Sequence, residues 1–183
     1  IDGVRAPKTG YWELFVNGVS QGWQKVEKNG HAEWKVRYRP GVIEVRGLHD
    51  RRAGTLIARR ETAGAPAALA LRADRPSMRA DREDTIVVAC EVLDAEGRVV
   101  PVAANEVQFS VTGPAKIIGV GNGDPSSHEP DRATKRKAFN GLCMALVQST
   151  GEAGEIRIQA QGQGLGGGVV TVRAIEAAAR QRL

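Results

Sequence analysis

Aromatic side chains are scarce in this sequence. They make up 4% of the 183 residues, and all three tryptophans, Trp12, Trp23 and Trp34, fall near the beginning. This uneven spread indicates two modules with different cores. No apolar run approaches the roughly 20 residues that a membrane-spanning helix requires, so we expect no membrane partner. The chain begins at Ile1 without a methionine and without a charged-then-apolar leader, which favours a fragment or processed form that carries no signal peptide.

The net charge of +5 is concentrated in one part of the chain. Residues 1–66 contain 12 Lys and Arg against 7 Asp and Glu, whereas residues 67–183 contain 14 of each. A basic protein gains affinity for nucleic acid by releasing counterions. Here the basic residues alternate with apolar ones, as in Lys35-Val36-Arg37-Tyr38-Arg39, which is typical of the solvated face of a sheet. We therefore expect no nucleic-acid partner.

Short strands separated by turns are predicted throughout residues 11–62. Asn17-Gly18 is a strong hairpin signal, because both residues accept a positive φ. The alternation over Glu33–Tyr38 predicts a strand with Trp34, Val36 and Tyr38 on one buried face. Trp12 is in phase with Leu14 and Val16 and is likewise predicted to be core. Further strands are predicted over residues 12–16, 19–26, 42–48 and 55–62, giving a small antiparallel sandwich over residues 1–66.

A linker at Gly64-Ala65-Pro66-Ala67 precedes a second module over residues 67–174. Seven short strands with frequent turns predict an immunoglobulin-like sandwich there. Residues 175–183 have a helix-forming composition but are short enough to form only a frayed tail. The predicted fold class is therefore all-β, with two tandem immunoglobulin-like antiparallel sandwiches. The strands of the second module are predicted over residues 68–73, 85–93, 106–112, 115–120, 141–149, 155–160 and 169–174.

The two cysteines, Cys90 and Cys143, fall on predicted strands of the second module, both in the inward phase. Antibody domains join two such strands by a disulfide next to a core tryptophan. Here Phe109 stands in the place of that tryptophan. Buried free cysteines also serve as small apolar residues, and we expect free thiols.

A polar loop from Gly121 to Glu129 holds the densest group of turn-forming and polar residues. A long loop between two strands is a common place for function. Ser127 beside His128 lacks the geometry of a nucleophile and its base. Calcium ligation by Asp124, Glu129 and Asp131 lacks the spacing of a known loop, so no metal site is predicted. We expect Asn122 and Asp124 to bond nearby backbone amides, with Gly121 and Gly123 at positive φ.

An interface role is the second interpretation of this loop, with Asn122, Asp124, His128 and Glu129 as the candidate contacts and His128 as the pH-sensitive one. Trp23 lies in a polar stretch and is the candidate for an exposed, glycan-stacking tryptophan. The basic run 132–137 is predicted to be a solvated flank of the loop.

Several segments resemble the non-catalytic C-terminal β domains of bacterial family 2 glycoside hydrolases, the multidomain β-galactosidases. In the first module these are Glu13-Leu14-Phe15-Val16-Asn17-Gly18, Tyr38-Arg39-Pro40-Gly41 and Thr62-Ala63-Gly64-Ala65-Pro66. In the second they are Val92-Leu93-Asp94-Ala95-Glu96-Gly97 and the loop from Gly121 to Glu129 followed by Lys137-Ala138-Phe139-Asn140-Gly141. The similarity covers residues 11–173 in the expected order, whereas residues 1–10 and the two cysteines depart from the family pattern.

The resemblance implies that this chain has no catalytic residues of its own. In the family the acid/base and nucleophile glutamates lie on a (β/α)₈ barrel, which needs about 200 residues or more. The expected partners are therefore the barrel and the N-terminal domains of a longer enzyme, and an oligomer could form through that enzyme. No cofactor is expected.

Two other classes of protein stay open at this point. A stand-alone carbohydrate-binding module would carry exposed aromatic residues in a row on one sheet face. A bacterial surface or adhesin-type immunoglobulin repeat would occur in tandem copies, without a barrel in the same reading frame.

Overall fold

The computed structural model describes residues 10–27, 29–48 and 55–176, and every regular element in these ranges is a β-strand. No helix in the described part of the chain is long and apolar enough to cross a membrane. The chain divides into two compact units, Ile1–Thr62 and Ala63–Leu183. Residues 1–9 at the start of the first predicted module, and residues 49–54 between two of its predicted strands, lie outside the described residues.

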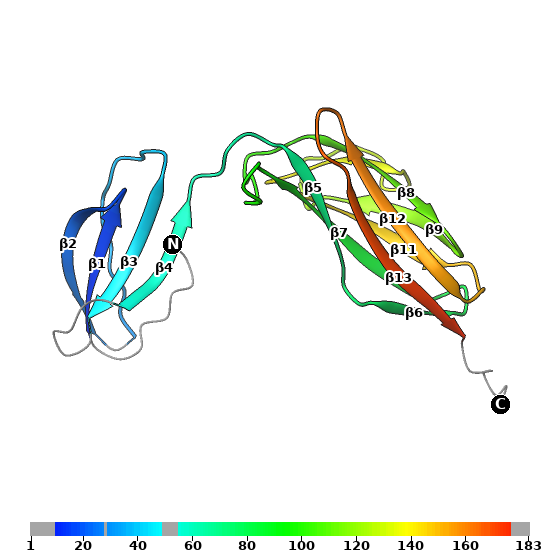
Figure 1. Ribbon diagram of the computed structural model, residues 1–183, viewed down its shortest axis with the longest axis horizontal. Coiled ribbons are helices and arrows are strands. Elements are labelled where there is room, and N and C mark those ends of the chain that lie inside the picture. Colours follow the sequence, from blue (N-terminus) through cyan, green and yellow to red (C-terminus); the bar gives the residue numbers. More distant parts are fainter. Residues whose placement is uncertain (1–9, 28, 49–54, 177–183) are drawn as a thin grey trace. The chain divides into compact units, whose positions relative to one another are not determined.

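The first unit contains a four-stranded antiparallel sheet, here called sheet A, with the order β2-β1-β3-β4 (Figure 1). The hairpin predicted at Asn17-Gly18 is confirmed, since both residues have positive φ, 50° and 78°. The Asn17 side chain also ties the hairpin to the start of β3: its Oδ1 accepts from Val42 N at 2.7 Å, and its Nδ2 donates to Pro40 O at 3.0 Å. The strands are β1 (Gly10–Val16), β2 (Val19–Val26), β3 (Val42–Leu48) and β4 (Thr55–Glu61).

The strand predicted over Glu33–Tyr38 is wrong, because residues 31–39 form no strand. The backbone N–H of Glu33 donates to the Gln24 side chain at 3.1 Å, and the Trp34 indole donates to Gly22 O at 3.1 Å. These side-chain contacts take the place of a strand ladder. Ala32 and Trp34 pack on the core of Trp12, Leu14, Val26 and Val45, whereas Val36 is exposed and Tyr38 is 77% exposed.

The second unit is a sandwich of two sheets (Figure 1). Sheet B has the order β5-β7-β11-β9, and sheet C has the order β10-β8-β12-β13-β6. All seven predicted strands are present, and the structure adds β6 and β10, which the sequence did not predict. The strands are β5 (Ala68–Ala73), β6 (Ser77–Ala80), β7 (Thr85–Leu93), β8 (Glu106–Thr112), β9 (Ala115–Gly121), β10 (Lys135–Lys137), β11 (Leu142–Ser149), β12 (Gly154–Gly162) and β13 (Gly168–Glu176).

The first strand of this unit changes sheets. β5 pairs with β7 in sheet B, and after a bend at Pro76 the chain re-enters as β6, which pairs with β13 in parallel. Proline has no N–H donor and interrupts a ladder, which explains the break. The predicted tail is corrected at its start, since Ile175 and Glu176 belong to β13; the remainder lies outside the described residues.

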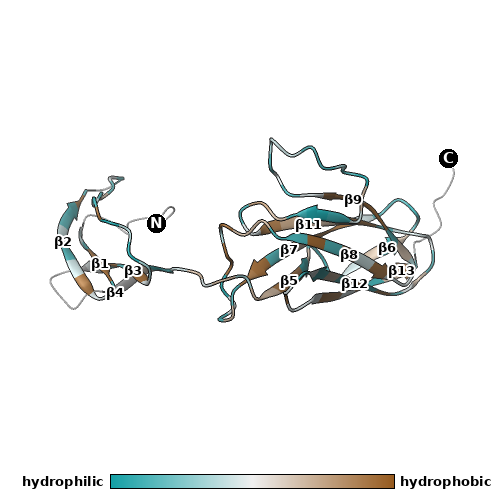
Figure 2. Ribbon diagram, turned by 90° about the horizontal axis from the view of Figure 1, so that it is seen from above, coloured by the Kyte–Doolittle hydropathy of each residue, from teal (hydrophilic) through white to brown (hydrophobic). Residues whose placement is uncertain are grey.

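The core of the second unit is formed by residues of both sheets, and burial follows the period of two along β7, β8 and β11. Figure 2 shows apolar and polar segments side by side along the ribbon of this unit. On β7 the inward residues are fully buried, while their neighbours are half-buried. Phe109 is buried in this core, in the place expected for it. The buried residues at the centre of the two core clusters include Ile86, Val88, Val92, Val107, Phe109, Val147, Ile156 and Ile158.

The cysteines are free thiols, as expected, and both are buried. Cys90 on β7 and Cys143 on β11 lie directly opposite each other in neighbouring strands of sheet B, so they do not link the two sheets as an antibody disulfide would. A hydrogen bond between the two sulfur atoms, together with burial, raises the pKa of the Cys143 thiol.

Candidate functional site

The polar loop after β9 is built from side chains that bond its own backbone. Asn122 Oδ1 accepts from Asp124 N at 3.0 Å, and Asp124 Oδ1 accepts from Ser126 N at 2.9 Å and from Ser126 Oγ at 2.7 Å. The Ser126 bonds lower the pKa of the Asp124 carboxyl, and the positive charge of a protonated His128 acts in the same direction. This is the expected turn chemistry. Gly123 has the expected positive φ of 76°, whereas the expectation for Gly121 is wrong.

Two further contacts close the loop onto β10. Asn122 Nδ2 donates to Lys137 O at 3.0 Å, and Lys137 N donates to the Glu129 carboxylate at 3.3 and 3.4 Å. The polar side chains of the loop are therefore largely used within it. His128 is exposed, as are Pro125 and Ser126 in the same loop.

Arg136 is the residue that the sequence reasoning missed. The basic run was predicted to be solvated, but Arg136 is only 2% exposed and alternates with its exposed neighbours Lys135 and Lys137 along β10. This correction has a physical reason: Arg136 is in phase with the buried Ala138, so the period of two directs it inward.

The Arg136 guanidinium joins the loop to both sheets. Its Nη2 donates to Val120 O on β9 of sheet B at 2.9 Å, although Arg136 itself belongs to β10 of sheet C. It also donates to the Asp131 carboxylate, and Nη1 donates to Ser127 Oγ at 3.1 Å and Glu129 O at 3.3 Å. A buried charge is tolerated only when it is paired and hydrogen-bonded, and these four acceptors supply that pairing.

These contacts decide what the loop can do chemically. Ser127 Oγ accepts hydrogen bonds from Arg136 Nη1 and Glu129 N, and among the described residues no hydrogen bond joins it to His128 as a nucleophile–base pair would require. Asp124, Glu129 and Asp131 each bond a different partner instead of converging on one point. Across the described residues, no group of three or more His, Cys, Asp or Glu could hold a metal ion. The loop is thus a rigid surface feature with an internal anchor.

A second anchored turn lies at Asp94, whose side chain is buried. It accepts from Gly64 N at 2.8 Å, from Arg98 N at 2.8 Å and from Arg98 Nε at 2.7 Å. Burial by itself would raise the pKa of this carboxyl, but the hydrogen bonds and the Arg98 charge outweigh burial and lower the pKa to about 2. Asp94 thereby fixes the predicted linker residue Gly64 to the second unit.

A pocket of about 520 Å³ opens at the end of β8 and β12, and its lining is uncharged except for Glu106. The Glu106 carboxylate is paired with Lys135 Nζ at 3.1 Å. Glycoside hydrolysis uses two carboxyl groups on either side of the bond, and this pocket offers one. The lining residues are Asn105, Glu106, Gln108, Gln161, Gly162 and Gln163.

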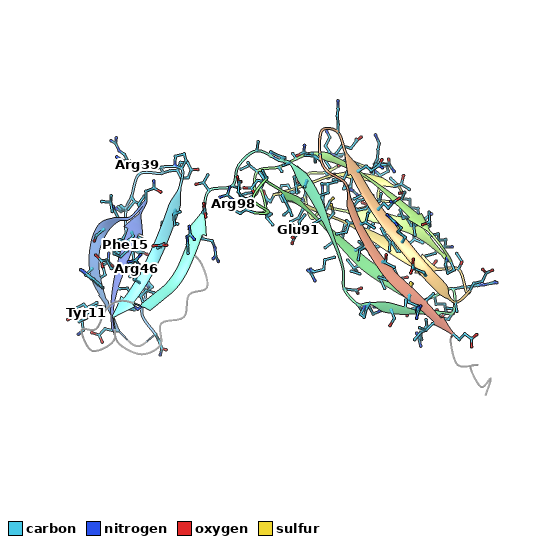
Figure 3. All side chains as sticks on the ribbon, in the orientation of Figure 1. Tyr11, Phe15, Arg39, Arg46, Glu91 and Arg98 are labelled. Carbon is cyan, nitrogen blue, oxygen red and sulfur yellow. The ribbon has the colours of Figure 1, made fainter. Side chains whose placement is uncertain are left out.

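The outer face of sheet A gathers aromatic side chains. Trp23 on β2 lies opposite Glu13 on β1, which places both on the face that also carries Tyr11 and Phe15. Trp23 is 44% exposed, in line with its predicted exposure, and Tyr11 is 52% exposed. The Arg46 guanidinium lies 4.5 Å from the centre of the Phe15 ring, a cation–π contact (Figure 3). Trp12 points to the opposite face and is buried, as predicted.

Comparison with known proteins shows that the chain is similar to parts of glycosidases. Residues 69–171 match the family described as glycoside hydrolase family 2 C-terminal domain 5, and residues 9–54 match a domain of unknown function. The chain therefore belongs to the C-terminal domains of family 2 glycoside hydrolases, and the predicted family is confirmed.

Individual relatives agree with this assignment. The chain is 41% identical over 167 residues to the β-galactosidase BoGH2A of Bacteroides ovatus, and the match covers 90% of this chain and 19% of that enzyme. It is 29% identical over 154 residues to a putative β-glucuronidase of Formosa agariphila, covering 80% of this chain and 14% of that protein. The crystal structure of a family 2 glycosyl hydrolase from Bacteroides cellulosilyticus is 30% identical with a TM-score of 0.80, covering 92% and 22% respectively. The chain thus spans about a fifth or less of the length of these relatives.

Proposed function

We propose that this chain is the non-catalytic, accessory C-terminal part of a family 2 glycosidase that hydrolyses β-galactosides. The observation that carries this proposal is the extent of the similarity: it runs through both units of the chain but through only 19% of the relative with 41% identity. That relative is named a β-galactosidase, which is why we favour galactosides over glucuronides. The accessory domains are residues 1–66 and 67–174, and their partners are the catalytic and N-terminal domains.

The described side chains support an accessory role. Within the described ranges, the loop carboxylates each bond separate groups, and the pocket at Glu106 contains one carboxylate. A retaining glycosidase needs two carboxyl groups about 5 Å apart across a sugar-binding cleft. We extend the proposal to the loop, with Asn122, Asp124, His128 and Glu129 at its surface as contacts to a neighbouring domain.

The test is an activity assay on two proteins, the chain of residues 1–183 and the product of the complete reading frame that encodes it. Both are incubated with 4-nitrophenyl β-D-galactoside and with the corresponding glucuronide. We expect no turnover above buffer by the chain and preferential turnover of the galactoside by the longer product. Hydrolysis by the chain alone, or a reading frame without a glycosidase domain, would contradict the proposal.

The aromatic face of sheet A favours a second function, binding of a saccharide by the first unit. Tyr11 and Trp23 offer exposed rings, and the row from Trp23 through the buried Glu13 to Arg46 places an exposed guanidinium on the same face. Flat rings stack on the apolar face of a pyranose, while charged groups bond its hydroxyls. This combination is the one expected of a carbohydrate-binding surface.

Titration with lactose, followed by the indole signals in NMR, tests this second function. We expect saturable shifts of the Trp23 signal that are lost in Trp23→Ala. The matched control is Tyr38→Ala, which removes an exposed aromatic ring from the same unit but from outside sheet A. Flat indole signals up to millimolar lactose would exclude saccharide binding here.

A further inference from the structure

The outer face of sheet B, the face turned away from the core, is apolar. On β11 the inward residues Cys143, Ala145 and Val147 alternate with Leu142, Met144 and Leu146, so both faces of this strand are apolar. Leu142 is 44% exposed and Met144 is 37% exposed. The register places further half-buried or exposed apolar side chains beside them. We call this set the sheet B face: Val87, Ala89, Ile118, Phe139, Leu142, Met144 and Leu146.

This pattern is unusual for the surface strand of an antiparallel sandwich. Such sheets normally have one face on the core and one polar face in water, whereas near-continuous apolar strands belong to sheets covered on both sides. Contiguous exposed apolar surface on a monomer commonly marks an interaction site. We therefore expect another protein surface to cover the sheet B face.

Sheet C provides an internal standard, because the same unit leaves its other outer face polar. Gln108 lies opposite Gln161, Ser110 opposite Gln159, and Thr112 opposite Arg157. The strand β13 continues this face with the exposed Thr171 and Arg173, and with Val169 and Ile175, which are each 47% exposed. The outer face of sheet C is thus mostly polar with two apolar residues on one strand, whereas apolar residues lie side by side on neighbouring strands of sheet B.

The composition of the sheet B face identifies its partner class. It lacks the hydroxyl and amide groups that recognise sugars, so a saccharide is a poor occupant. Arg72 lies opposite Ala89 on the edge strand β5, and Glu91 lies opposite Leu142 on β7, so charges of both signs flank the apolar residues, as in protein interfaces. The polar loop adjoins it, since Gly121 lies opposite Met144.

We infer that the sheet B face docks on the catalytic portion of the same polypeptide. This inference rests on the function proposed above. The relatives carry this region within chains about five times longer, as 19% of the β-galactosidase and 22% of the Bacteroides cellulosilyticus enzyme. A covalently attached neighbour is present at high effective concentration, so it outcompetes a second copy of the chain for an exposed apolar face.

The two methionines of the chain report on this docking. Met144 lies at the centre of the sheet B face, while Met78 is 2% exposed in the core of the same unit. Hydrogen peroxide oxidises exposed methionines first, so the rate at Met144 relative to Met78 measures the exposure of the face. The experiment compares peptide-resolved oxidation in the isolated chain and in the complete reading-frame product.

In the isolated chain we expect Met144 to oxidise well before Met78. In the longer product we expect oxidation of Met144 to slow by about tenfold, towards the rate of the buried Met78. Equal Met144 rates in the two proteins would overturn the inference. Protection in the isolated chain that grows with concentration would overturn it too, in favour of a second copy of the chain. The proposed function has its own test. It fails if the chain alone hydrolyses the substrate or if the reading frame contains no glycosidase domain, and neither result depends on the oxidation rates.

Discussion

The two sheets of the second unit share one core but differ in their outer faces. Sheet C turns glutamine, serine, threonine and arginine outward, as a solvated sheet does, whereas sheet B turns outward leucine, methionine and isoleucine. Inward residues of both sheets contribute to the same two buried apolar clusters. The difference between the sheets therefore lies in their outer faces, and it is the observation behind the docking that we propose.

The comparison depends first on the two sheets being held together at their open edge, where Arg136 bonds Val120 O across the sandwich. Arg136→Met should destabilise the second unit by about 3 kcal/mol, because it leaves the buried Val120 O without this hydrogen bond. Lys135→Met, which removes the neighbouring exposed cation, should cost below about 1 kcal/mol. Urea unfolding of the two variants measures both values. Equal effects would mean that Arg136 is no more than a surface cation.

Neighbouring valines on β7 sharpen the comparison between the inner and outer faces of sheet B. Val88 is fully buried and points inward, whereas Val87 points outward and is half-buried. Val88→Ala should cost about 2 kcal/mol in the isolated chain, since it opens a cavity in the core. Val87→Ala should cost less than about 1 kcal/mol there. Denaturant unfolding of the two variants measures both changes in the free energy of unfolding. Similar changes would show that the outer face is already packed in the isolated chain.

The anchored turn at Asp94 gives the second unit an acid-sensitive contact outside both faces. Its folded pKa of about 2 lies below the ordinary value of 3.8, so its contribution is complete above pH 3.8 and is lost as the pH falls through about 2. The difference in melting temperature between the natural chain and Asp94→Asn should therefore shrink between pH of about 4 and about 2. Thermal unfolding across this range checks the result. A gap that stays constant with pH would contradict it.

The smallest effect is expected when a thiol reagent is added to the folded chain, because both cysteines lie on the inner face of sheet B. Burial and the contact between the two sulfur atoms raise the Cys143 pKa, so the reactive thiolate is suppressed. Iodoacetamide should leave the mass of the folded chain unchanged and add two adducts after unfolding without reductant. An unfolded chain that takes up no adduct would instead contain a disulfide.

The sequence predicted those parts of the fold that depend on local chemistry. The period of two located all strands of the second unit except the short β6 and β10, and Asn17-Gly18 located the first hairpin because its backbone preference needs no distant partner. The strand over Glu33–Tyr38 failed for the opposite reason. Contacts from Gln24 and Gly22 capture that segment, and its own alternation cannot reveal them.

The candidate site was predicted in the same uneven way. The turn chemistry of Asn122 and Asp124 follows from their own side chains and was foreseen. Arg136 lies in a basic run, and the charge of that run led to the prediction that all of it is solvated. Only its position two residues before the buried Ala138 indicated that its side chain faces the interior. The long-range bond from Gly64 to Asp94 has no local signal at all.

The most direct test of the difference between the two faces places one lysine on each of them. Met144→Lys charges the sheet B face, and Thr171→Lys charges the outer face of sheet C. In the isolated chain both variants should stay within about 1 kcal/mol of the natural chain, because both positions are exposed. In the complete reading-frame product, Met144→Lys should destabilise the assembly by about 3 kcal/mol through burial of an unpaired charge, while Thr171→Lys should remain silent. If Met144→Lys is as silent as Thr171→Lys in the longer product, the sheet B face is not a docking surface.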